Sequence, residues 1–275
     1  MKNIKKKAEP EQTIVDFGKQ WKKYQTNEGY YASVELLSDI FGPLVNLNEL
    51  QGAKVAEIGS GTGRIVNMLL ACGVDTVTAI EPSKAYDVLL ENTNHAKERV
   101  TCLQVTGNLL PTEENFDYIL SIGVLHHIEK PLPCVQAAFS ALKPGGRFLI
   151  WLYGKEGNTL YLVIATFFRA ITTILPDSLL EILVRIIDWN LVVWMKLCQF
   201  FPLPLSQYMN GYLSKLSPAN RRLTIFDQLN PAYAKYYTRQ EALDLIKSGE
   251  FVDIKIYHRH GYSWTVIGTK PFSSP

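Results

Sequence analysis

Hydrophobic and polar residues follow two different periods along the middle of the chain. From Ala53 onward, short β-branched runs alternate with stretches of helical spacing, a pattern typical of parallel strands joined by helical crossovers. The pattern predicts strands at Lys54–Ile58, Thr76–Ile80, Val100–Val105, Asp117–Ile122 and Arg147–Leu152, and helices at Gly63–Ala71, Lys84–Asn92 and Pro133–Leu142. The sequence therefore predicts a doubly wound α/β core.

The C-terminal part of the chain is predicted to complete the sheet. Thr238 and Glu241 form a capping-box pattern that opens a helix. Phe251–His258 and Ser263–Thr269 then have the pattern of two strands joined by a short turn at His260–Gly261, which requires the pair to be antiparallel. We expect a mostly parallel sheet with one antiparallel last strand.

Helical segments are predicted before the core and inside it. Thr13–Tyr24 and Tyr31–Phe41 have helical spacing and could cover one end of the sheet. Residues 158–205 are unusually apolar, but Pro176 and several charged residues divide them into pieces too short to span a bilayer. Within Ser178–Phe201, polar residues occupy one narrow stripe, so this helix must bury a wide apolar face. A lid or dimer helix is our main interpretation, and a membrane-surface or lipid-binding role is the alternative.

These patterns divide the chain into four parts. We expect a disordered basic tail at residues 1–12, N-terminal helices and the core at 13–154, a mostly helical insertion at 155–235, and a C-terminal helix with a closing hairpin at 236–275. A chain of 275 residues, 47% hydrophobic and 20% charged, can bury the core that this organisation requires.

Charge and cysteine content narrow the expected partners. The formal net charge of +2 is small for a nucleic-acid-binding surface, so we expect no nucleic acid among the partners. The four cysteines lie far apart and form no C-x-x-C pair, which favours reduced thiols over a metal or disulfide framework. No apolar segment follows the N-terminal lysines as in a signal peptide, so a cytoplasmic location is expected.

The sharpest motif lies between the first predicted strand and the first predicted helix. Glu57, Gly59, Gly61 and Gly63 have the spacing Glu-x-Gly-x-Gly-x-Gly; the glycines permit a tight turn, and the helix N-terminus offers N–H groups to a ligand. A dinucleotide fingerprint would require glycine where Arg64 stands, which disfavours a nicotinamide dehydrogenase. A P-loop is excluded because no Gly-Lys-Ser/Thr follows.

This motif resembles the first motif of class I S-adenosylmethionine-dependent methyltransferases of the small-molecule type, and the resemblance extends through most of the chain after it. It implies a seven-stranded Rossmann-like sheet with a reversed last strand, and S-adenosyl-L-methionine as a donor that leaves S-adenosyl-L-homocysteine. The turn residues named above, together with Ser60, would bind the donor. Roughly 20 residues beyond, Glu81 and Pro82 end the second strand, where a carboxylate can accept hydrogen bonds from both ribose hydroxyls.

Further segments extend the resemblance around the expected donor site. Thr106–Pro111 resembles the segment that cradles adenine; Asn108 replaces the usual aspartate and can still accept a hydrogen bond, and Leu109 lies beside it. The resemblance implies that Ser121 and Ile122 face the methionine part and that Leu125 borders the transferred methyl group. Phe17–Trp21 resembles a segment that folds over the donor. Gln20 and Trp21 are therefore candidate contacts, although Trp21 could equally pack in the core.

Methyl transfer requires alignment and, for a hydroxyl nucleophile, removal of a proton. His126 is expected beside the methyl group and is the first candidate for this base, with a packed structural histidine as the alternative. The neighbouring His127 is expected to point mainly into the structure, but it is kept among the candidate acceptor contacts.

The other candidate acceptor contacts are aromatic residues and histidines near the C-terminal strands. His258 and His260 alternate on one face of the sixth strand, near the rim where open α/β sheets bind ligands. Aromatic side chains before the C-terminal helix and after the strand turn could form a wall for sugar or phenol stacking; they are Tyr233, Tyr236, Tyr237 and Tyr262.

The combined expectation is an O-methyltransferase of a small, lipid-linked or sugar-linked acceptor. N- or C-methylation is the near alternative. A nucleotide-dependent oxidoreductase and a non-catalytic protein that binds S-adenosylmethionine and recruits a membrane or a partner are alternatives of other classes. Residues 158–205 could also mediate peripheral contact with the inner membrane surface or a homodimer. No metal site is predicted.

Overall fold

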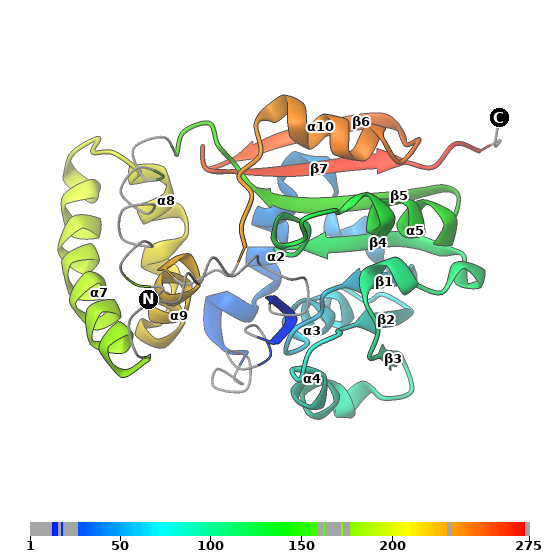
Figure 1. Cartoon of the computed structure of the whole chain (residues 1–275), viewed down its shortest axis with the longest axis horizontal. Coiled ribbons are helices and arrows are strands. Elements are labelled where there is room, and N and C mark those ends of the chain that lie inside the picture. The colour runs from blue at the N-terminus through cyan, green and yellow to red at the C-terminus, as the bar shows by residue number, and fades with distance from the viewer. Residues whose placement is uncertain are drawn as a thin grey trace, which may run out of the picture.

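One seven-stranded sheet organises the protein (Figure 1). The computed structural model describes residues 13–15, 18, 27–158, 162, 172, 177–229 and 233–272. The strands are β1 (Lys54–Ile58), β2 (Thr76–Ile80), β3 (Val100–Leu103), β4 (Phe116–Ile122), β5 (Leu142–Tyr153), β6 (Val252–Arg259) and β7 (Ser263–Thr269). They lie in the order β3-β2-β1-β4-β5-β7-β6, and β7 alone runs opposite to the other six. This confirms the predicted fold class and its reversed last strand.

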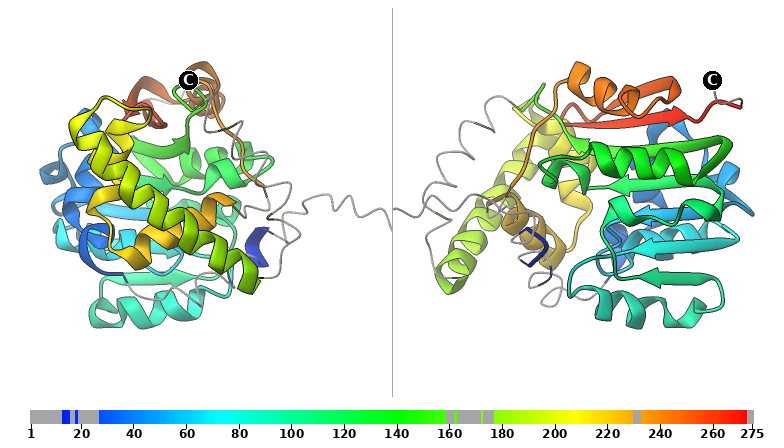
Figure 2. Two further views of the ribbon diagram at one scale, coloured as in Figure 1. Left: turned by 90° about the vertical axis from the view of Figure 1, so that its left-hand side faces the viewer. Right: turned by 45° about the vertical axis from the view of Figure 1, so that its right-hand side comes forward.

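Helices cover both faces of the sheet (Figures 1 and 2). They are α2 (Val34–Phe41), α3 (Arg64–Ala71), α4 (Tyr86–Thr93), α5 (Leu132–Ala141) and α10 (Arg239–Lys247). In the described residues, 3₁₀ turns lie at Gly29–Ala32, Gly42–Leu44, Leu47–Leu50, Asn94–Ala96, Gly107–Leu109, Thr112–Glu114, Leu125–His127 and Leu213–Lys215.

Successive strand residues point to opposite faces, so each strand contributes to two cores. Val55 packs with α2 and α3, whereas Ala56 packs with α5 and α10.

Most of the predicted boundaries agree with the structure. Thr238 and Glu241 form the predicted capping box: each side chain accepts a hydrogen bond from the other residue's backbone N–H. β3 ends at Leu103 rather than Val105. Residues 143–146, which separate the predicted helix from the predicted fifth strand, lie inside β5 as an irregularity, because pairing with β4 passes from Leu142 directly to Arg147.

The insertion forms α7 (Asp177–Phe200), α8 (Ser206–Gly211) and α9 (Pro218–Leu229), which stand beside the carboxyl end of the sheet (Figures 1 and 2). One side of α7 packs against the protein through Leu180, Val184 and Met195. The other side keeps large apolar residues exposed, namely Leu179, Ile182, Ile186, Trp189, Val193, Leu197 and Phe200. Other described parts of the chain do not cover this outer side, and its role as a lid, dimer or membrane-surface face stays a prediction. No helix in the described ranges has the length and hydropathy that a membrane crossing needs.

A buried ion pair joins α7 to α9. Asp188 and Arg221 have side chains only 6% and 9% exposed and share two hydrogen bonds. Arg222 reaches the same carboxylate at 3.2 Å, but its side chain is 43% exposed. The two arginines therefore provide a buried and a solvated partner for a single carboxylate.

We expect Asp188→Asn to destabilise the protein by about 3–5 kcal/mol, because it leaves the Arg221 cation buried without its counter-ion. Arg222→Gln, the matched control, should cost about 1 kcal/mol or less, since solvent already screens that pair. Urea denaturation monitored by tryptophan fluorescence measures both. Equal losses in the two variants would contradict the assignment of Asp188 to Arg221.

Candidate functional site

A glycine-rich turn connects β1 to α3 at the carboxyl end of the sheet. Gly59, Gly61 and Gly63 have φ angles of 79°, 53° and 80°, a region that favours glycine. The N–H groups of Gly59 and Ser60 donate to the carbonyl of Ile80 at 2.8 and 2.9 Å. The end of β2 therefore fixes the conformation of the turn.

The carboxylate of Glu81 completes this connection. Its Oε2 atom accepts from the N–H of Gly61 at 2.8 Å, and its Oε1 atom accepts from the N–H of Ser83 at 2.9 Å. Glu81 is buried, and Pro82 is half-buried beside it. The bond from Gly61 thus joins the two sequence motifs of the expected donor site, and the bond from Ser83 holds the carboxylate within its own loop.

Two buried polar atoms near the turn lack a hydrogen-bond partner among the described residues: Oε2 of Glu57 and Oγ of Ser121. Burial raises the pKa of Glu57 to about 8, and the nearby Glu81 adds to the effect, while Ser60 and Arg64 oppose it. Glu57 is therefore protonated at neutral pH. An unsatisfied carboxyl group beside a glycine turn is a position where a polar ligand group fits.

The remaining expected donor contacts lie around this turn. Asn108 and Leu109 are exposed in the 3₁₀ turn that follows β3. Ile122 is at the end of β4 and lines the cavity described below, whereas Leu125 is fully buried in the core.

The N-terminal segment reaches the same turn. Asn27 donates to the carbonyl of Thr62 and accepts from its hydroxyl. Gly18 lies against Ser83 and Lys84. Gln20 and Trp21 lie outside the described residues, so their expected role stays a prediction.

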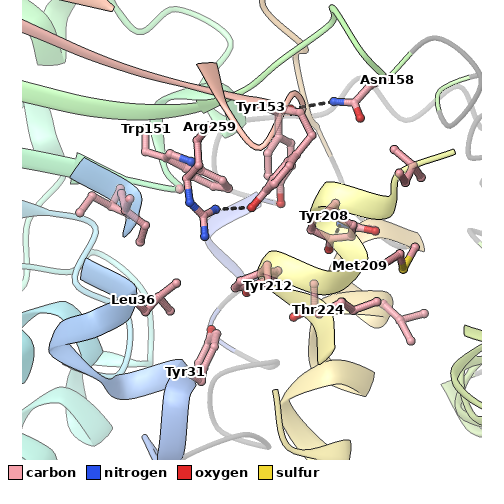
Figure 3. Close-up of a pocket in the computed structure, with 18 of the residues that line it drawn as sticks. Tyr31, Leu36, Trp151, Tyr153, Asn158, Tyr208, Met209, Tyr212, Thr224 and Arg259 are labelled. Atoms are coloured by element: carbon pink, nitrogen blue, oxygen red, sulfur yellow. Dashed lines mark hydrogen bonds between the residues drawn. The ribbon is translucent and has the colours of Figure 1, made fainter. Parts of the chain in front are cut away.

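A cavity of about 390 Å³ lies between the carboxyl end of the sheet, α2 and the insertion helices (Figure 3). The sheet side provides Ile122, Gly123, Trp151, Tyr153, Arg259 and Tyr262. The helices provide Leu36, Ile40, Tyr208, Met209, Tyr212, Thr224 and Gln228, among others. Its volume is typical of small-ligand pockets, and seven Tyr or Trp side chains share the wall with a larger number of aliphatic ones.

The two adjacent histidines have different environments. His126 is fully buried, its ring nitrogens have no hydrogen-bond partner in the part of the chain that the structure describes, and its ring centroid lies 3.9 Å from that of Tyr153. Burial and the neighbouring His127 hold the pKa of His126 well below its ordinary value. The cavity is lined by His127, not by His126. His127 is also buried and bonds through Nδ1 to the backbone of Tyr233, but because it lines the cavity it stays a candidate acceptor contact.

The other acceptor candidates divide into two groups. Tyr236 and Tyr262 line the cavity. Tyr237 is buried in the core, and Tyr233 contributes a backbone carbonyl 2.7 Å from Nδ1 of His127. Neither Tyr233 nor Tyr237 is among the residues that form the cavity wall.

The expectation that His258 and His260 share one face of the sixth strand is wrong. β6 ends at Arg259, and His260 has a φ of 47° that turns the chain. His258 stacks on Trp264 with ring centroids 4.0 Å apart, whereas His260 bonds to Asp39 of α2. The residue between them, Arg259, is the one that lines the cavity.

Sequence reasoning missed several cavity residues. Trp151 and Tyr153 alternate at the carboxyl end of β5, so the period of the strand could have identified them. Tyr208 and Tyr212 come from the insertion, where the sequence pattern did not single out any residue that contacts the sheet. Tyr31 precedes α2 and reaches the cavity beside Arg64.

Comparison with known proteins finds methyltransferase relatives for the middle part of the chain. A family model described as a methyltransferase domain matches residues 56–148. A tRNA U34 carboxymethyltransferase of Pseudoalteromonas atlantica is 28% identical over 115 residues, 41% of this chain and 36% of that protein. The chain thus spans little more than a third of that relative's length.

Solved structures show the same fold. An O-methyltransferase family protein of Burkholderia thailandensis has a TM-score of 0.53 at 10% identity, and the superposition covers 88% of this chain and 56% of that protein. The S-adenosylmethionine-dependent methyltransferase SibL has a TM-score of 0.52 at 15% identity, and the superposition covers 86% of this chain and 55% of SibL.

These comparisons correct our expectation about partners. We expected no nucleic acid and a small, lipid-linked or sugar-linked acceptor, but several relatives are named for a tRNA substrate. Net charge did not predict this partner class, because a value of +2 averages over the whole chain and does not describe any one surface.

We expect Gly59→Ala to destabilise the protein more than Gly52→Ala. Both positions have positive φ, so both variants carry the backbone strain of about 1–2 kcal/mol. A Cβ atom at Gly59 would also lie 2.4 Å from Cγ2 of Val124, whereas one at Gly52 would meet no atom within 4 Å. Adding Val124→Ala to Gly59→Ala should recover the excess loss in urea denaturation. No recovery would contradict this steric explanation.

Glu57 should also make stability depend on pH. The folded protein keeps this proton up to about pH 8, while the unfolded chain releases it near the ordinary pKa of 4.5. Folding therefore takes up a proton between these values, and the free energy of unfolding falls as pH rises through this window. We expect Glu57→Gln to be less sensitive to pH between 5 and 8 than the unmodified protein in thermal denaturation. Parallel pH profiles of the two proteins would show that Glu57 is ionised in the folded state.

Proposed function

Since this chain belongs to the class I S-adenosylmethionine-dependent methyltransferases, we propose that it methylates a planar aromatic acceptor in the cavity beside Ile122 and Gly123. The observation that carries the proposal is the aromatic wall of that cavity, formed by Tyr31, Trp151, Tyr153, Tyr208, Tyr212, Tyr236 and Tyr262. Rings of this kind favour planar ligands through stacked and edge-on contacts. The family membership disfavours the oxidoreductase and non-catalytic alternatives.

The residues around the glycine turn suit the donor. We infer that Glu81 accepts from the ribose hydroxyls and that the amide oxygen of Asn108 accepts from the adenine amino group. The unpartnered carboxyl oxygen of Glu57 and the hydroxyl of Ser121 provide further polar groups for the methionine part. When bound, the donor supplies an electrophilic methyl group on a sulfonium. The protein's task is then to align the acceptor with this methyl group.

His127 is better placed than His126 to remove a proton from the acceptor. Its Nδ1 atom lies 2.7 Å from the carbonyl of Tyr233, and a carbonyl can only accept, so Nδ1 carries the hydrogen. In the neutral ring, Nε2 then has the lone pair that a base requires. This supports an oxygen nucleophile, whose hydroxyl proton must be removed. Methylation at nitrogen or carbon remains the alternative.

The names of the relatives suggest which acceptor to test first. A uracil ring is planar, and its size is compatible with the aromatic cavity. We therefore propose an RNA base as the first acceptor class, one that carries a ring hydroxyl group if the methylated atom is oxygen. A second candidate is transfer of a carboxymethyl group to a tRNA uridine, as those relatives are named; the similarity over residues of the cofactor half favours it.

The test uses methyl-labelled S-adenosylmethionine and unfractionated tRNA. We expect label in the RNA, and we expect His127→Gln to lower turnover about 10²- to 10⁴-fold while affinity for S-adenosylhomocysteine is unchanged. Mass analysis of the released nucleosides identifies the methylated atom. The second candidate is tested in a parallel reaction with an analogue of the donor whose sulfonium carries a carboxymethyl group in place of the methyl group, because S-adenosylmethionine cannot supply a carboxymethyl group.

Glu91→Gln, an exposed change on α4, is the matched control and should have no effect. Failure of the unmodified protein to bind S-adenosylhomocysteine in calorimetry would refute the donor assignment. Normal binding of that product without transfer to tRNA would refute the RNA acceptor.

A further inference from the structure

A buried arginine in the cavity wall has unused hydrogen-bond donors. Arg259 is 2% exposed, and Figure 3 shows its guanidinium extending toward the space near Leu36 and Tyr212. Its Nε and Nη2 atoms donate to Oδ2 of Asp39, and Nη1 donates to the hydroxyl of Tyr262. A guanidinium has five N–H groups, so two have no partner among the described residues.

The charged side chains of the cavity wall are positive. Among the described residues, the wall contains Arg64 and Arg259 and no carboxylate. Asp39 lies on α2 behind Arg259 and is not part of the wall. Burial opposes ionisation of Asp39, but hydrogen bonds and charge from His260 and Arg259 lower its pKa below the ordinary value. Asp39 is therefore a fixed anion that orients the guanidinium from outside the cavity.

Aromatic rings surround the guanidinium. Its central carbon lies 5.2 Å from the ring centroid of Tyr212 and 5.4 Å from that of Tyr262. Tyr208 packs edge-on against Tyr262 at 4.5 Å. The cation is thus held at the border of the aromatic surface that would contact a planar acceptor. Because Arg259 is buried, each unpaired N–H group costs free energy, and a ligand that accepts from these groups removes that cost.

We propose that the acceptor carries an oxyanion, a carboxylate or a phosphate, and that Arg259 binds it through its two remaining N–H groups. A guanidinium is suited to this task because its planar fork matches the geometry of both anions. The inference rests on the proposed function, since it concerns the acceptor cavity of that methyltransferase. It adds a charge requirement that aromatic walls alone do not impose.

The test compares charged and neutral probes on the full chain saturated with S-adenosylhomocysteine. Benzoate is compared with benzamide, and uridine monophosphate with uridine, by calorimetry. We expect the charged member of at least one pair to bind about tenfold tighter or better. The first pair reports a carboxylate and the second a phosphate, so the result also identifies which oxyanion the cavity accepts.

The decisive variant is Arg259→Gln combined with Asp39→Asn, because it removes both charges and leaves no unpaired buried carboxylate. We expect it to lose the preference for the charged probe while keeping its affinity for S-adenosylhomocysteine. Arg259→Lys should keep only part of the preference, since it retains the charge but loses the fork. Equal binding of charged and neutral probes to the unmodified protein, or an unchanged preference in the double variant, would overturn the proposal. Failure of the unmodified protein to bind S-adenosylhomocysteine would instead refute the proposed function.

Discussion

The carboxylate of Glu81 holds together the two loops that we propose form the donor site. It accepts from Gly61 in the turn after β1 and from Ser83 in the turn after β2, so one side chain sets the distance between two strand ends. The backbone bonds from Gly59 and Ser60 to Ile80 reinforce the same junction. A parallel sheet places these ends at one edge. The cavity begins at the end of β4, the strand on the other side of β1.

A second junction determines the other side of the cavity. Asp39 of α2 binds both Arg259 and His260, and Thr265 of β7 donates to the carbonyl of Ile40. These contacts join an N-terminal helix to a hairpin more than 200 residues away. Because Arg259 is buried, moving Asp39 away from it would leave a desolvated positive charge. The ion pair therefore holds α2, which carries Asp39, against the hairpin. The pair that shapes the wall is therefore also structural.

Local signals predicted the core and the glycine turn well. The strand period, the glycine spacing and the capping box at Thr238 depend on residues close in sequence, so each can be recognised without tertiary information. The acceptor half depends on long-range packing. Nothing near Tyr208 indicates that it packs against Tyr262, and the burial that lowers the pKa of His126 exists only in the folded chain. His258 and His260 were misassigned because one residue with positive φ ends the alternation of the strand.

The two halves of the site carry different kinds of information. The family model covers residues 56–148, which include the glycine turn and Glu81. Trp151, Tyr153, Tyr208, Tyr212, Arg259 and Tyr262 all follow that range, and with Tyr31 they form most of the aromatic and cationic cavity wall. A match within the first range identifies the donor chemistry that the sheet supports. We propose that side chains from α2, the insertion and the closing hairpin select the acceptor, so the shape and charge of this cavity decide which acceptor fits.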